Sequence, residues 1–366
     1  MRKHYLDNIR WITVIIVVIY HVFYMYNAEG VLGGLGRITD LPVQYYDIFQ
    51  YLVYPWFMPI LFVVSGISAR IYLDRHSGKE FLRSRTLKLL VPSTIGLFVF
   101  QFVQGYVSMS IGGGFEGLVA EGVPKPIIFF IMVLSGSGVL WFMHLLWVYC
   151  VMLLLIRKVE KGKLLKAGEK TPLWLIMLFV FPIWGAAQIL NAPIISVYRV
   201  AFYFVFFILG FYIFSNDTVI DRLKRISVPL ILVAVTLCVI FTVSYFGENY
   251  ADKPINRGFL YVLDAYAGSL AMLSGMARFG DFSNAFTKWM SGHSFGLYVF
   301  HYLGISSVAL FVAKPKLAPA VVCYLLSLVA GFLFGYGLYA IISRIPFFRW
   351  AVLGIKKKKG DINVQG

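Results

Sequence analysis

The chain has 366 residues, of which 60% are hydrophobic and only 14% are charged. Soluble domains average about half apolar and a quarter charged residues, so this composition excludes an ordinary soluble enzyme and favours a polytopic membrane protein. The net charge is +16, and the three cysteines, Cys150, Cys238 and Cys323, all lie in apolar stretches. That placement argues against a disulfide framework and gives no metal-ligand spacing, so no metal is expected.

Ten apolar stretches approach the length of about 20 residues that a membrane crossing requires. In chain order they cover residues 8–26, 46–72, 86–111, 138–157, 172–190, 197–215, 227–246, 258–279, 293–312 and 319–342. The first resembles a signal peptide, but no small-residue cleavage site follows it, so we predict a retained helix. Residues 125–136 are too short to span and lie between prolines and a Ser-Gly pair, which favours an interfacial or re-entrant segment.

These stretches predict an all-α polytopic membrane protein with one membrane domain at 1–345 and a basic cytoplasmic tail at 346–366. If the N-terminus is cytoplasmic, the opposite side holds only seven of the 33 Lys and Arg residues: Arg37, Lys125, Arg199, Lys253, Arg257, Lys314 and Lys316. Because basic residues concentrate on the cytoplasmic side, both termini are predicted to be cytoplasmic in a multi-pass protein of the cytoplasmic membrane. The net positive charge then faces the anionic lipids of the cytoplasmic leaflet, and the run Lys356–Lys359 is predicted to anchor the tail at this surface. No nucleic-acid partner is expected.

Arg10 and His21 both fall in the first apolar stretch, eleven residues apart. On a helix that spacing puts them on one face, separated by roughly 16 Å, with Arg10 at the interface and His21 near the middle of the bilayer. An interfacial arginine and an interhelical histidine are the plain alternatives. An ionisable residue inside a span by default marks a function, and the shared face favours a functional pair that points at protein or water.

The second and third stretches carry further signals. Two prolines in the run YPWFMP at residues 54–59 predict a kink, and Gly66 permits close approach of another backbone or a ligand. Arg83, Arg85 and Lys88 then enter the third stretch. They are either an ordinary topology signal or a phosphate clamp, since arginine forks match phosphate oxygens.

Several later polar residues are candidates to orient His21 or to contact an acceptor. Trp141 and His144 are three residues apart on one helix face, Asp264 is a carboxylate inside an apolar span, and His301 ends the run GLYVFH. Asp47, at the start of the second stretch, is a further candidate. The sequence leaves the choice among them open.

Taken together, these motifs resemble acyltransferase family 3, whose members are integral-membrane acyltransferases that modify extracytoplasmic glycans and some small acceptors. The motifs are Arg10-x(10)-His21, FVVSG at 62–66, FLRSRTLKLLVP at 81–92, LWF at 140–142 and GLYVFH at 296–301. The likeness covers nearly the whole chain. The basic motif at 81–92 most resembles glucan-succinylating members, and polysaccharide O-acetylating members belong to the same family.

The resemblance implies transfer of an acetyl or succinyl group from cytoplasmic acyl-coenzyme A to a hydroxyl of an extracytoplasmic glycan or small acceptor. It maps His21 as the catalytic histidine with Arg10 as its partner, and it maps Arg83, Arg85 and Lys88 to donor binding; Arg70 is a further donor-side candidate. A general base and a covalent acyl-histidine both remain open. A transporter or flippase for a polysaccharide precursor is the main alternative, because buried arginine and histidine also mark transport paths. A structural partner in a polysaccharide assembly complex is a third interpretation.

Overall fold

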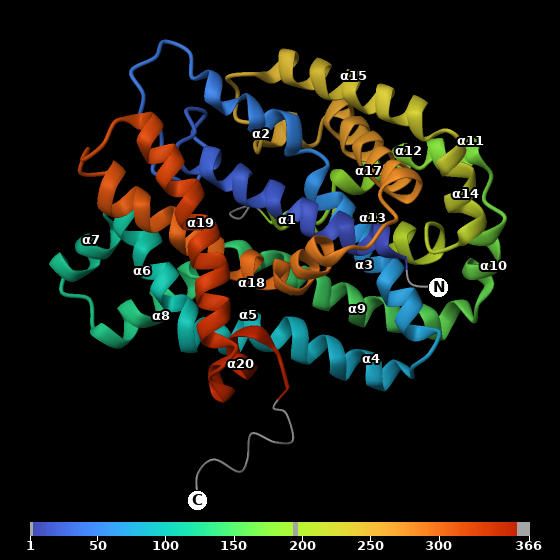
Figure 1. Cartoon of the computed structure of the whole chain (residues 1–366), viewed down its shortest axis with the longest axis horizontal. Coiled ribbons are helices and arrows are strands. Elements are labelled where there is room, and N and C mark those ends of the chain that lie inside the picture. Colours follow the sequence, from blue (N-terminus) through green and yellow to red (C-terminus); the bar gives the residue numbers. More distant parts are fainter. Residues whose placement is uncertain (1–2, 193–196, 357–366) are drawn as a thin grey trace, which may run out of the picture.

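The computed structural model describes residues 3–192 and 197–356, and these residues are almost entirely helical (Figure 1). Eight helical spans are long and apolar enough to cross a membrane, and two bent helix pairs raise the number to ten within the described residues. The predicted fold class, an all-α protein with about ten spans, is therefore confirmed.

The eight long spans are α1 (His4–Met25); η1, α2 and α3 (Tyr45–Asp47, Ile48–Val53 and Phe57–Leu73); α4, η2, α5, η3 and α6 (Gly78–Arg85, Thr86–Leu90, Val91–Gly96, Leu97–Gln101 and Phe102–Ile111); η4 and α9 (Gly138–Leu140 and Trp141–Glu160); α15 (Ser227–Tyr245); α17 (Phe259–Phe279); α18 and η5 (Ala285–Val308 and Ala309–Ala313); and α19 (Ala320–Ile342). The bent pairs are α10 (Lys163–Glu169) with α11 and α12 (Leu173–Leu178 and Val180–Ala187), and α13 (Val200–Tyr212) with α14 (Asp217–Arg225). The shorter helices are α7 (Gly114–Ala120), α8 (Lys125–Ser135), α16 (Lys253–Asn256) and α20 (Pro346–Leu353).

Helix α1 lies in the middle of the bundle, where it contacts α3, α17, α18 and α19 (Figure 1). By contrast, α15 and α19 have many exposed apolar side chains, such as Leu232, Val239, Leu325 and Leu333. Water would penalise that surface, whereas hydrocarbon would not, so these helices have the outer surface of a membrane protein. The central position of α1 is what keeps its polar residues away from lipid.

Two prolines shape the spans that flank the site. The chain leaves the helix between α2 and α3 at Tyr54–Trp56, as the predicted kink around Pro55 requires. Pro92 has no N–H to donate to the carbonyl of Lys88, and the preceding segment η2 is a π-helix in which Val91 N–H bonds Thr86 O. Lys88 therefore sits on a locally widened turn, a form that is frequent at functional sites.

Glycines allow α3 and α13 to touch backbone to backbone. A Cβ on Gly66 would collide with the carbonyl of Phe207, and one on Gly210 would collide with the carbonyl of Val63. The close approach predicted for Gly66 is therefore made by another helix. This backbone contact fixes the position of α3 relative to α13.

Replacing Gly66 by alanine should destabilise the protein. The new methyl group meets rigid backbone, and overpacking of this kind typically costs about 1–3 kcal/mol. The matched control is Gly337→Ala on α19, where an added Cβ meets nothing within 4 Å. Thermal melting in detergent should show a clear drop for Gly66→Ala and none for Gly337→Ala; equal melting temperatures would contradict the crossing.

The first part of the predicted basic tail is ordered. Helix α20 packs against α5, and Gly354, at φ +60°, lies against the backbone of Leu87 and Lys88. Lys356 is the last described residue, so Lys357–Lys359 lie outside the described residues and their role as a surface anchor stays a prediction.

Candidate active site

Two of the cavities that α1 lines carry the candidate site, and we name them by their characteristic residues. The basic cavity, of about 960 Å³, contains five cations: Arg10, Arg83, Arg85, Lys88 and Lys356. The histidine cavity, of about 460 Å³, contains His21.

The basic cavity combines a strong positive charge with an apolar wall. Glu80 is the single carboxylate among its described lining residues, and that carboxylate is engaged by Ser77 in the capping box of α4. The apolar part of the wall comes from Val14, Leu61, Phe142, Met143 and Phe295. Such a site suits a ligand with a polyanionic head and a thin, less polar extension.

The cations of this cavity come from three different parts of the chain. Arg83 and Arg85 end α4 and Lys88 follows on η2, so one continuous segment supplies three charges. The guanidinium of Arg85 also lies 5.1 Å from the ring centre of Phe81, which fixes its position on the wall. Lys356 comes from the segment after α20. The sequence did not predict its place in the cavity, because a run of four lysines does not indicate which of them lines a cavity.

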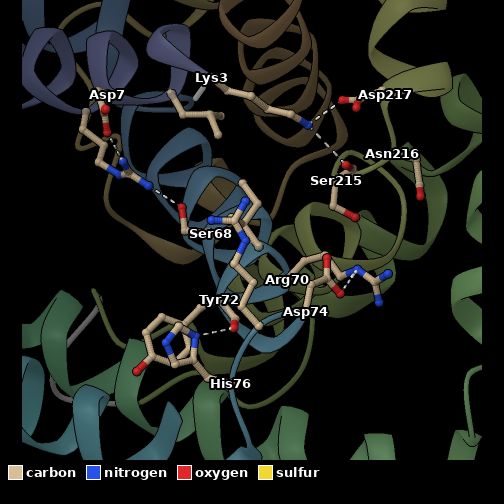
Figure 2. Close-up of a pocket in the computed structure, with 14 residues that line it drawn as sticks. Lys3, Asp7, Ser68, Arg70, Tyr72, Asp74, His76, Ser215, Asn216 and Asp217 are labelled. Atoms are coloured by element: carbon tan, nitrogen blue, oxygen red, sulfur yellow. Dashed lines mark hydrogen bonds and ion pairs between the residues drawn. The ribbon is translucent and has the colours of Figure 1, made fainter. Parts of the chain in front are cut away.

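Arg10 lines both the basic cavity and a neighbouring polar cavity of about 960 Å³. Figure 2 shows the polar cavity. The guanidinium of Arg10 donates to Asp7 Oδ1 at 2.6 Å and to the hydroxyl of Ser68. Arg70 lines the polar cavity and not the basic one, and it forms an ion pair with Asp74 at 3.1 Å. The donor-side candidates of the sequence are thus divided between two cavities that meet at Arg10.

His21 lies in the histidine cavity among aromatic side chains, several of them tyrosines. Tyr20, Tyr24, Tyr54, Trp141, Tyr203, Tyr298 and Tyr302 line this cavity with it, and residues 31–34 form part of its wall. The ring centre of His21 is 5.2 Å from that of Tyr302 and 5.0 Å from that of His301.

The hydrogen bonds around His21 determine which ring nitrogen can accept a proton. His301 Nδ1 lies 3.0 Å from the carbonyl of Leu297 and 2.9 Å from that of Tyr298, so Nδ1 carries the hydrogen. In the neutral ring, His301 Nε2 is then an acceptor, and it lies 3.2 Å from His21 Nδ1.

His21 Nδ1 also lies 2.8 Å from the carbonyl of Val17, so this nitrogen must be a donor. In a neutral ring the lone pair is therefore on His21 Nε2, and Nε2 has no hydrogen-bond partner among the described residues. The histidine is only partly buried and its ring lines a cavity, so the free lone pair is available to a bound molecule. This is the arrangement that a general base needs.

The other candidates for orienting His21 lie elsewhere. His144 is bonded at both nitrogens, to the hydroxyl of Tyr198 at 2.9 Å and to the carbonyl of Ser93 at 2.6 Å, and it ties α9 to its neighbours. Asp264 is fully buried on α17, lines none of these cavities, and has no hydrogen-bond partner among the described residues. Trp141, in contrast, does line the histidine cavity.

Asp47 reaches the histidine cavity through a chain of hydrogen bonds. It accepts from Gln50 at 3.0 Å, Gln50 accepts from the hydroxyl of Tyr250, and that hydroxyl lies 3.1 Å from the hydroxyl of Tyr20, which lines the cavity. Glu29 belongs to the same network, because its carboxyl group neighbours that of Asp47. Burial and this neighbouring carboxylate raise the pKa of Glu29 to about 8. Sequence reasoning missed Glu29, Gln50 and Tyr250, because loop and helix residues far apart in the chain make up this network.

A scan against protein-family models matches residues 3–350 to an acyltransferase domain, the model of acyltransferase family 3. A search of curated proteins and a search of solved structures found no match. The family match covers nearly the whole chain and every lining residue of the histidine cavity. Four lining residues of the basic cavity lie beyond the match: Leu353, Gly354, Ile355 and Lys356. The chain therefore belongs to acyltransferase family 3 and is a membrane-bound O-acyltransferase.

Proposed function

We propose that this O-acyltransferase takes an acetyl or succinyl group from acyl-coenzyme A bound in the basic cavity. The group is transferred to a hydroxyl held in the histidine cavity. The observation that carries the proposal is that the same four helices line both cavities. On α1, Arg10 and Val14 line the basic cavity and His21 lines the histidine cavity; on α18, Phe295 lines the first and Tyr302 the second. Helices α3 and α9 contribute to both as well.

The direction of each helix supports this end-to-end arrangement. Residue numbers increase from the basic to the histidine cavity along α1 and α18, and they decrease in that direction along α3 and α9. The cavities are therefore stacked along the helix axes, which in a membrane protein run across the bilayer. A donor can enter at one end and an acceptor at the other, without coenzyme A crossing the membrane.

The basic cavity fits the donor. Coenzyme A has a phosphate-rich head on a long, thin pantetheine arm. Arg83, Arg85 and Lys88 can hold the phosphates by charge-assisted hydrogen bonds, while the arm follows the apolar wall toward the histidine cavity. The lysines and arginines gathered at the basic cavity favour an opening of this cavity to the cytoplasm, where acyl-coenzyme A is available.

The hydrogen bonds of His21 fit the chemistry. Nε2 removes the proton from the acceptor hydroxyl as the hydroxyl oxygen bonds to the thioester carbonyl carbon. The carbon–sulfur bond then breaks, and the leaving thiolate takes the proton back from His21. The products are an ester and free coenzyme A, and the histidine returns to its initial state. The carbonyl of Val17 and Nε2 of His301 both accept from His21 Nδ1, and together they hold the ring in the tautomer that this step needs.

Replacing His301 should reduce turnover without affecting donor binding. His301→Phe removes one of the two acceptors of the His21 Nδ1 hydrogen and leaves only the carbonyl of Val17, so the ring is held less firmly in the required tautomer and orientation. His301→Gln keeps a side-chain acceptor and should recover part of the rate. The loss should be smaller than the about 10²–10⁴-fold that a missing general base causes. The measurement is kcat for acyl transfer beside the dissociation constant of acyl-coenzyme A. Equal kcat for His301→Phe and the parent, or no rescue by glutamine, would contradict the positioning role.

Turnover of acetyl- and succinyl-coenzyme A by the purified protein tests the proposal against the transporter alternative. A transferase with a base beside its donor site should slowly pass the acyl group to water, releasing free thiol, and a transporter has no reason to do so. Mass spectrometry of cell-surface glycans from cells with and without the protein then identifies the acceptor class. Absence of both donor binding and thiol release would overturn the proposed function.

A further inference from the structure

Tyr298 separates the two cavities. Among the described lining residues, it alone belongs to both the basic and the histidine cavity. Its neighbours fall on one side or the other: Phe142 lines the basic cavity only, whereas Trp141 and Tyr302 line the histidine cavity only. Its side chain is only 6% exposed, so the ring fills the space between the cavities rather than projecting into open solvent.

Two different attachments hold this residue. The backbone carbonyl of Tyr298 accepts from His301 Nδ1 at 2.9 Å, which ties the backbone to the histidine pair. The side chain is held by one hydrogen bond, from its hydroxyl to the carbonyl of Val139 in η4, and by an edge contact with Phe142 at 6.2 Å between ring centres. A single hydrogen bond contributes only about 0.5–1.5 kcal/mol, so the ring can turn aside while the backbone keeps the histidines in place.

We propose that Tyr298 is the partition that the acyl thioester displaces on its way to His21, and that its ring sets the size of the acyl group that passes. This inference rests on the proposed function, because it assumes a donor in the basic cavity. An acyl group carried by the pantetheine arm must pass the one side chain common to both cavities. The ring should favour a short acyl group such as acetyl or succinyl and exclude a long chain.

Changing the size of residue 298 tests the proposal with acetyl-, succinyl-, hexanoyl- and octanoyl-coenzyme A as probes. Tyr298→Ala should raise the ratio of kcat/KM for hexanoyl- over acetyl-coenzyme A by about tenfold or more, as expected when a pocket gains room for several methylenes. Tyr298→Trp should bind acetyl-coenzyme A as the parent does but turn it over at least about tenfold more slowly. The matched control is Tyr336→Ala on α19, because Tyr336 lines neither cavity and its removal should leave the chain-length ratio unchanged.

Two failures are distinguishable. If the parent neither binds nor turns over any of the four donors, the proposed function fails. If the parent is active and Tyr298→Ala keeps its chain-length ratio, or Tyr298→Trp is as fast as the parent, the function stands and the partition is overturned. Retained acetyl-coenzyme A binding shows that each variant is folded; Tyr298→Leu replaces the alanine variant should the latter not fold, with the same expected shift toward longer chains.

Discussion

His21→Ala should abolish acyl transfer and leave acyl-coenzyme A binding unchanged. The ring lines the histidine cavity, whereas the cations that we assign to the donor line the basic cavity, so the substitution removes the proposed base without touching the proposed donor site. A general base typically supplies about 10²–10⁴-fold in rate. The measurement is transfer from radiolabelled acetyl-coenzyme A in proteoliposomes, with donor binding determined separately.

His293→Ala is the matched control for this variant. His293 lies on α18, is partly buried, and its Nδ1 bonds the carbonyl of Trp289. It lines neither the basic nor the histidine cavity, so its removal should change neither rate nor binding by more than a small factor. A folded His21→Ala protein with normal transfer would return His21 to the role of a polar contact between packed spans.

Arg83→Ala combined with Arg85→Ala should weaken acyl-coenzyme A binding by about a hundredfold or more. Each charge-assisted contact to phosphate contributes about 1.5–3 kcal/mol, and each 1.4 kcal/mol is a factor of ten in the dissociation constant. The effect should be largest at low salt, because added ions screen the attraction of Arg83 and Arg85 for phosphate in the parent and so reduce what the substitution removes. Isothermal titration with coenzyme A and with acetyl-coenzyme A measures it.

Lys163→Ala with Lys166→Ala is the matched control for the double arginine variant. Both lysines are exposed on α10 and line none of the cavities, so the control removes the same charge without touching the basic cavity. Binding by the control should be close to that of the parent. If both double variants bind coenzyme A equally well, Arg83 and Arg85 serve only as a topology signal.

Hydropathy predicted the spans because it depends on local composition alone. It located the beginning of α18 too late, at residue 293 rather than Ala285, because that helix starts with a polar turn capped by Asn284 and Thr287. It also gave no sign that the chain bends by 114° between α10 and the helices that follow, or by 104° between α13 and α14. Pro172 and Asn216 stand at the two bends, immediately before α11 and α14, and a hydropathy average does not register where one helix ends and the next begins.

The geometry of the candidate site was predictable where one helix carries its residues. Arg10 and His21 share α1, so their spacing could be read from the helical repeat. His301 could not be selected over His144 or Asp264, because its contact with His21 joins residues 280 positions apart in the chain. Lys356 and Tyr298 could not be selected from the sequence either, because only the folded structure shows which cavities they line.

One measurement tests most directly whether an acyl group passes from the basic to the histidine cavity across the membrane. Sealed proteoliposomes are loaded with envelope glycans of the producing cell, and radiolabelled acetyl- or succinyl-coenzyme A is added outside only. We predict that label becomes ester-linked to the glycan inside, that free coenzyme A accumulates outside, and that His21→Ala vesicles show neither. Label on the inner glycan only when the donor is also inside, or equal labelling by His21→Ala vesicles, would contradict transfer between the two cavities.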